Sequence, residues 1–108
     1  AVEDKVKIAT ILYQEARLHV FNANSERAID LLREAIKILS TKQYKDHYIY
    51  DHSKQLLAGI YIDNRQFGKA KKLIKPRTLS GQLSLASIAF SESKLKTIIQ
   101  YKKRHSTY

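Results

Sequence analysis

The sequence predicts an all-α protein of five or six helices, arranged as stacked antiparallel hairpins. Apolar residues recur at steps of three and four along most of its 108 residues, which is the periodicity of helices with one buried face. A β-sandwich needs turns every 8–12 residues or so, and one Pro and three Gly are too few to form them. With 44% hydrophobic residues the chain can bury the core of one small domain.

The first predicted hairpin spans about residues 3–40. A helix over residues 3–21 brings Val6, Leu12 and Ala16 onto one face, and the polar run from 22 to 24 ends it. Ser25 is expected to cap the next helix, residues 26–40, because its hydroxyl can accept a hydrogen bond from a backbone N–H of the first turn. This second helix has the clearest apolar stripe of the chain, formed by Ala28, Ile29, Leu32, Ala35, Ile36 and Leu39.

The second predicted hairpin spans about residues 46–76. Its first helix, residues 46–63, is followed by a polar turn and by a shorter helix over residues 67–75. Pro76 ends that helix because it lacks a backbone N–H and restricts the residue before it. The inner side of the first helix is expected to hold Tyr50, Leu56, Leu57, Ile60 and Tyr61.

The remaining residues, 79–105, are interpreted as a degenerate third pair. A short helix over residues 83–90 is followed by one that Ser91 or Ser93 caps, with Leu95, Ile98 and Ile99 buried. The prediction is therefore one helical-repeat domain over residues 1–108. Because the chain begins with Ala1 and has no Met, we interpret it as a processed or excised piece of a longer protein.

The two hairpins resemble tetratricopeptide repeats. The second contains Leu57-Ala58-x2-Tyr61 and Ala70-x3-Ile74, and the first contains Ala28-x3-Leu32. The interval from Ala16 to Ala28 equals that from Ala58 to Ala70, and small residues at these places let two helices cross closely. The resemblance covers residues 6–76 and implies a right-handed solenoid.

Two features depart from the usual tetratricopeptide pattern. Glu15 stands where the pattern has a large apolar residue. The sequence interval from Ala16 to Ala58, which we call the repeat offset, is longer than the usual period of about 34 residues. The resemblance is therefore to degenerate repeats.

Two narrower resemblances concern large assemblies. The run Glu15-Ala16-Arg17-Leu18, the segment from 28 to 36 and Leu83-Ser84-Leu85-Ala86 resemble the helical FAT region of ATM-type phosphatidylinositol-3-kinase-like protein kinases. That resemblance implies a scaffold segment that contains none of the kinase's ATP site. The second hairpin is also similar to the N-terminal repeats of anaphase-promoting-complex scaffold subunits.

The net charge of +10 belongs to the second half of the chain. Residues 1–53 contain 8 basic and 8 acidic side chains, whereas residues 54–108 contain 12 basic and 2 acidic ones. A basic face of this kind can bind an acidic protein segment, anionic lipid or nucleic acid. No nucleic-acid motif accompanies it, so we favour a protein partner and keep nucleic acid as the alternative. The basic face consists of Lys69, Lys71, Lys72, Lys75, Arg77, Lys94, Lys102, Lys103 and Arg104.

Stacked hairpins present a concave surface lined by the first helix of each pair. By helical phase, the predicted groove residues are Tyr13, Arg17, Phe21, His52, Gln55 and Ile62. An extended or helical peptide is expected to lie there, held by aromatic contacts and by an ion pair between Arg17 and a carboxylate. The alternative is that these residues pack against an adjacent repeat of a longer chain.

Catalytic signals are weak. The three glycines are too dispersed for a phosphate-binding loop. Asp46-His47 and Asp51-His52 form a repeated acid–imidazole pair that could bind a metal. The two histidines are five positions apart, however, whereas a spacing of four would align them on one helix face. We therefore favour a solvated helix start. His19 is expected to be half-buried and structural. We therefore expect no catalytic residue, no metal and no cofactor, with a small enzyme as the least favoured class.

These observations together favour a non-catalytic protein–protein interaction scaffold. The zero cysteine count is compatible with a reducing compartment, and no apolar run approaches the roughly 18 residues of a membrane span. The expected location is therefore the cytoplasm or the nucleus, without membrane insertion. The alternative function is a basic helical domain that binds nucleic acid through its second half.

Overall fold

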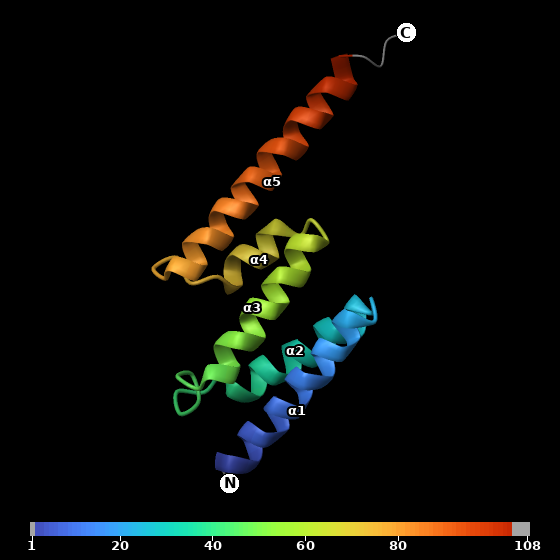
Figure 1. Ribbon diagram of the computed structural model, residues 1–108. Coiled ribbons are helices and arrows are strands. Elements are labelled where there is room, and N and C mark those ends of the chain that lie inside the picture. Colours follow the sequence, from blue (N-terminus) through green and yellow to red (C-terminus); the bar gives the residue numbers. More distant parts are fainter. Residues whose placement is uncertain (1, 105–108) are drawn as a thin grey trace. The chain divides into compact units, whose positions relative to one another are not determined.

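The computed structural model describes residues 2–104, and all regular structure in that range is α-helical (Figure 1). The all-α prediction is confirmed. The chain divides into two compact units, Ala1–Leu73 and Ile74–Tyr108, where one domain was predicted. The first unit holds α1 to α4 and the second holds α5. The helices are α1 (Val2–Phe21), α2 (Ser25–Leu39), α3 (Tyr48–Asp63), α4 (Phe67–Leu73) and α5 (Leu79–Arg104).

The first unit consists of two helical hairpins. Helix α1 packs on α2, and α3 packs on α4. Helix α3 also contacts both α1 and α2, so the second hairpin stacks on the first and the two leading helices are neighbours. This adjacency of α1 and α3 is what brings the predicted groove residues of the two helices together.

The two hairpins turn in the same way. Ala23 and Arg65 are separated by the repeat offset, and both have positive φ, at 60° and 63°. Two hydrogen bonds close the first turn, from Ala23 N to Val20 O at 3.1 Å and from Asn24 N to His19 O at 2.8 Å. Both hydrogen bonds recur in the second turn, one repeat offset later. Arg65 N donates to Ile62 O at 3.0 Å, and Gln66 N donates to Tyr61 O at 2.8 Å. This is the Schellman arrangement that ends many helices.

The helix-crossing alanines are all buried. Ala16, Ala28 and Ala70 are inaccessible to solvent and Ala58 nearly so. Small side chains at these places let the backbones of paired helices approach. The turns and the buried alanines of the two hairpins therefore recur at the same interval in the sequence.

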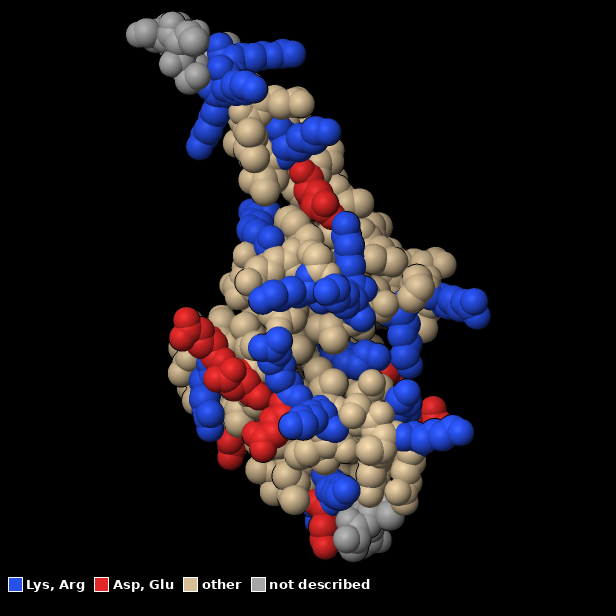
Figure 2. Space-filling model, turned by 180° about the vertical axis from the view of Figure 1, so that it is seen from behind, with Lys and Arg blue, Asp and Glu red and all other residues tan. Residues whose placement is uncertain are grey.

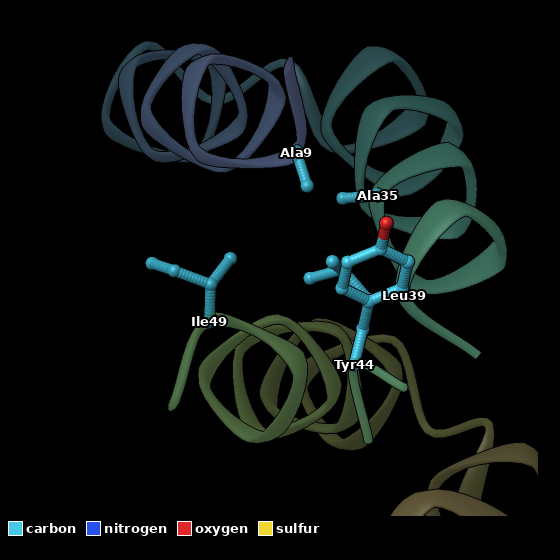
Figure 3. Packing of buried hydrophobic residues seen from close by; sticks show 5 residues of the cluster. All are labelled: Ala9, Ala35, Leu39, Tyr44 and Ile49. Carbon is cyan, nitrogen blue, oxygen red and sulfur yellow. The ribbon is translucent and has the colours of Figure 1, made fainter. Parts of the chain in front are cut away.

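A cluster of buried apolar residues joins the two hairpins. Figure 3 shows Ala9 of α1 and Ala35 of α2 pointing toward each other, with Ile49 of α3 below them. Tyr44, which the sequence placed in a polar stretch between helices, is buried beside Leu39. Its ring anchors the α2–α3 connection to the core.

Several predicted helix ends are corrected. Asn24, not Ser25, caps α2: its side-chain oxygen accepts from Arg27 N at 3.4 Å, and Ser25 is the first helical residue. Helix α3 begins at Tyr48 rather than at residue 46, because the Nδ1 atom of His47 accepts the N–H of Ile49 at 3.2 Å and acts as the cap. Helix α4 ends at Leu73, short of the predicted residue 75.

The predicted third pair is wrong, because residues 79–104 form the single helix α5. Neither Ser91 nor Ser93 caps a helix; Thr97 Oγ1 donates to Ser93 O at 3.0 Å, as a hydroxyl inside a continuous helix can. Leu95, Ile98 and Ile99 are exposed rather than buried, since the helix that was expected to cover them is absent. The end of the predicted pair, His105, lies outside the described residues.

The start of α5 depends on a glycine. Thr78 Oγ1 donates to Lys75 O at 3.1 Å and accepts from Gly81 N at 2.9 Å, which organises the first turn. A Cβ atom at Gly81 would overlap the carbonyl oxygen of Lys75. Only glycine therefore permits this close approach of the helix to the preceding segment.

Candidate binding groove

An open hollow of about 400 Å³ lies between α1 and α3. Tyr13, His52, Gln55 and Leu56 line it. The first three were predicted as groove residues. The rings of Tyr13 and His52 face each other across the two helices, with centroids 6.2 Å apart and planes inclined by 53°.

Helical spacing explains why these side chains meet. Tyr13 and Arg17 lie four positions apart on α1, and His52 lies three and four positions before Gln55 and Leu56 on α3, so each set shares a face of its helix. Because α1 contacts α3, the two faces border the same hollow. Sequence alone placed Leu56 on the inner side of its helix. It is half-buried and lines the hollow, while its neighbour Leu57 is buried in the core.

A row of rings continues from the hollow along α3. His47 stacks on Tyr48, with centroids 4.7 Å apart and planes inclined by 26°, and Tyr48 meets His52 edge-on at 5.5 Å. With Tyr13 these rings form what we call the aromatic row: Tyr13, His52, Tyr48 and His47. Tyr48 is 61% exposed, so its ring is open to a ligand. Neither Tyr48 nor His47 was predicted to belong to the groove, although the spacing of four between Tyr48 and His52 was a usable signal.

Arg17 places a positive charge beside the hollow. Its guanidinium carbon lies 5.9 Å from the centroid of the Tyr13 ring, and its Nη1 donates to Gln14 Oε1 at 3.2 Å. The guanidinium group has five N–H donors and binds carboxylates in a two-point geometry. Arg17 is solvent-exposed, so an incoming carboxylate can reach it.

Three predicted groove residues do not line the hollow: Arg17, which lies beside the Tyr13 ring, and two residues farther along the helices. Phe21, the last residue of α1, is exposed and lies outside the lining set. Ile62, near the end of α3, is half-buried. Both lie one or more helical turns beyond the lining residues of their helices, which explains the difference.

The histidines do not form a metal centre in this part of the chain. Among residues 2–104, no group of three or more metal-ligating side chains is placed to hold an ion. His47 uses its Nδ1 as the cap of α3, which gives this imidazole a structural role. His19 is half-buried on α1.

The basic residues belong to both units. In the first unit, Lys69, Lys71 and Lys72 are exposed on α4, and the ammonium of Lys69 lies 5.6 Å from the centroid of the Tyr61 ring. In the second unit the exposed residues are Lys75 and Arg77 before α5, Lys94 along it, and Lys102, Lys103 and Arg104 in its last turn. Ala1–Leu73 contains 13 basic and 9 acidic residues, and Ile74–Tyr108 contains 7 and 1. Figure 2 shows basic side chains widely spread and acidic ones gathered in fewer places.

Comparison of the chain with protein-family models, with curated proteins and with solved structures gives no match. Among the described residues, none of the helices combines the length and apolar character needed to cross a membrane.

Proposed function

We propose that the chain is a non-catalytic protein–protein interaction module that binds a peptide segment of a partner in the groove between α1 and α3. The observation that carries the proposal is the hollow lined by Tyr13, His52, Gln55 and Leu56, with exposed rings along one side. Aromatic side chains of this kind supply large contact area with few rotamers to order. The repeated turn and the alanine spacing support a tetratricopeptide-like stack of hairpins.

The side chains of the groove indicate the chemistry of the segment. The aromatic row offers flat faces to an apolar or aromatic side chain, and the amide of Gln55 can bond a peptide backbone. Arg17 lies one helical turn from Tyr13 and can pair with a carboxylate. The expected ligand is therefore a short peptide that carries an acidic residue next to an apolar or aromatic one.

The test is a peptide array read by fluorescence anisotropy with the best sequences. Peptides that combine Glu or Asp with Leu, Phe or Tyr should bind, and their Gln or Asn counterparts should bind more weakly. Arg17→Gln and Tyr48→Ala should each lower the affinity for the acidic peptide about tenfold, which is about 1.4 kcal/mol. Lys37→Gln, an exposed lysine of α2 away from the groove, is the matched control and should change nothing.

Nucleic acid is the alternative ligand, favoured by the exposed lysines of α4. An oligo(dT) or oligo(U) probe tests it, because phosphate binding by several lysines weakens steeply as salt rises. Oligonucleotide binding that the triple variant Lys69→Gln/Lys71→Gln/Lys72→Gln abolishes, together with no bound peptide, would overturn the proposed function. Peptide binding that survives changes in the groove would also contradict it.

A further inference from the structure

Helix α1 carries an apolar stripe on the side away from the groove. Ile8, Ile11 and Leu18 are 49%, 58% and 64% exposed, and Glu15 is exposed between the last two. These four residues follow one another at steps of three and four, so they share one face of the helix. We call this set the outer face of α1. Tyr13, two positions after Ile11, points about 200° away around the helix, toward the groove.

Most of the equivalent face of α3 is buried, and Tyr50, the counterpart of Ile8, is half-buried. The repeat offset, at which the turns also recur, relates Ile11, Glu15 and Leu18 to Ser53, Leu57 and Ile60. These three residues of α3 are 0%, 3% and 5% exposed. They follow Ile49, which joins the core cluster with α1 and α2, on the same side of α3. In the second hairpin this face therefore packs against a preceding hairpin, whereas in the first it is uncovered.

Helix α5 carries a stripe that complements the outer face of α1. Steps of three, four and seven place Leu83, Phe90, Ile98 and Tyr101 on one side, all exposed, with exposed Lys94 among them. Glu15 interrupts the apolar stripe of α1, and Lys94 interrupts that of α5. Each surface is thus an apolar stripe interrupted by one charged residue, and the two charges have opposite sign. Helix α5, about 39 Å long, is also longer than α1, about 30 Å.

We propose that the outer face of α1 binds α5 of a second copy of the chain, with Glu15 paired to Lys94. Apolar stripes with this spacing pack helix against helix, and a buried charge pair selects the correct partner. The two surfaces differ, so each copy of the chain presents both the outer face of α1 and the stripe of α5. Association therefore proceeds head to tail. The outer face does not include the groove, so this inference stands independently of the proposed function.

Sedimentation velocity over a range of protein concentrations tests the proposal. The wild-type weight-average mass should rise with concentration above the 12.5 kDa of the monomer. Glu15→Lys and Lys94→Glu should each weaken the association about tenfold, and the double variant, which restores opposite charges, should recover most of it. Glu34→Lys, at an exposed position of α2, is the matched control and should associate as wild type does.

Far-UV circular dichroism identifies any variant that has lost its helices. If a charge reversal does so, the neutral substitutions Glu15→Gln and Lys94→Gln are used in its place. A wild-type chain that stays monomeric at every concentration would overturn the proposal. So would association that the double variant does not recover. Cross-links between residues 15 and 94 within one chain of a monomer would show that α5 of the same chain is the occupant, which also overturns it.

Discussion

The hairpins α1–α2 and α3–α4 share a turn but differ in the helix that follows it. Both turns place a residue with positive φ at the same point and close with the same hydrogen bonds. Helix α2 then continues for 15 residues and buries Ala28, Leu31, Leu32, Ala35 and Leu39, whereas α4 ends after seven residues and buries Ala70 alone. The turn is thus encoded locally, and the apolar residues after it decide how much core each hairpin adds.

The surfaces of the two second helices differ as well. Helix α2 carries both acidic residues, Glu26, Asp30 and Glu34, and basic ones, whereas the charged residues of α4 are all lysines. The first hairpin is close to neutral, and the second begins the basic part of the chain. The +10 charge therefore does not extend evenly over the two hairpins, and the groove between α1 and α3 lies where they meet.

The largest expected difference between the hairpins concerns core leucines. Leu31→Ala on α2 should lower the free energy of unfolding by about 2–5 kcal/mol, because it leaves a cavity at a position that is 2% exposed. The equivalent change one repeat offset later, Leu73→Ala, removes a half-buried side chain and should cost less. Urea denaturation followed by circular dichroism measures both, and equal losses would contradict the unequal contribution of the two second helices.

The shared turn is tested by glycine substitutions. Ala23→Gly and Arg65→Gly should each raise the free energy of unfolding by about 1 kcal/mol, since glycine adopts positive φ without a clash of Cβ with the backbone. The two gains should be similar if the turns are equivalent. Thermal denaturation provides the comparison, with Ala23→Ser as the control that keeps a Cβ atom. A loss of stability in either variant would show that the turns are not equivalent.

The smallest expected effect distinguishes the buried from the uncovered face. Ser53 on α3 is fully buried, and its hydroxyl oxygen has no hydrogen-bond partner among the described residues. Ser53→Ala should therefore be neutral or stabilising by up to about 1 kcal/mol, because it removes an unsatisfied polar group. Ile11→Ser at the equivalent, exposed position of α1 should change monomer stability by less than about 0.5 kcal/mol. Urea denaturation midpoints measure both changes. A clear loss of stability in Ser53→Ala would show that the Ser53 hydroxyl has a hydrogen-bond partner.

Much of the groove could be predicted because helical spacing is local. Tyr13 with Arg17 and His52 with Gln55 share helix faces on sequence grounds alone, and the repeat suggested that the two helices are neighbours. His47 was missed because it was placed inside the helix instead of at its cap, and Tyr48 because its spacing of four from His52 was not used. His47 is a cap, and a cap is recognised from hydrogen bonds that the sequence does not display.

The error in α5 has a related cause. Ser91 and Ser93 are common capping residues and were interpreted as a break, but no glycine or proline follows Gly81 as far as Arg104 to interrupt the helix. Serine is tolerated inside a helix when its hydroxyl has solvent or a backbone carbonyl to bond. Composition thus permitted both a pair and a single helix, and the chain forms the single helix.

The sequence by itself determined the helical class, the order of the first four helices and the repeat offset between the hairpins, because apolar periodicity and turn residues act over a few neighbouring positions. Tertiary structure alone decided which helical faces are covered. Ile11 and Ser53 occupy equivalent positions, yet the isoleucine is exposed and the serine is buried. Burial depends on what packs against a face. The first hairpin packs against α3, whereas the equivalent face of α1 is apolar and exposed to solvent.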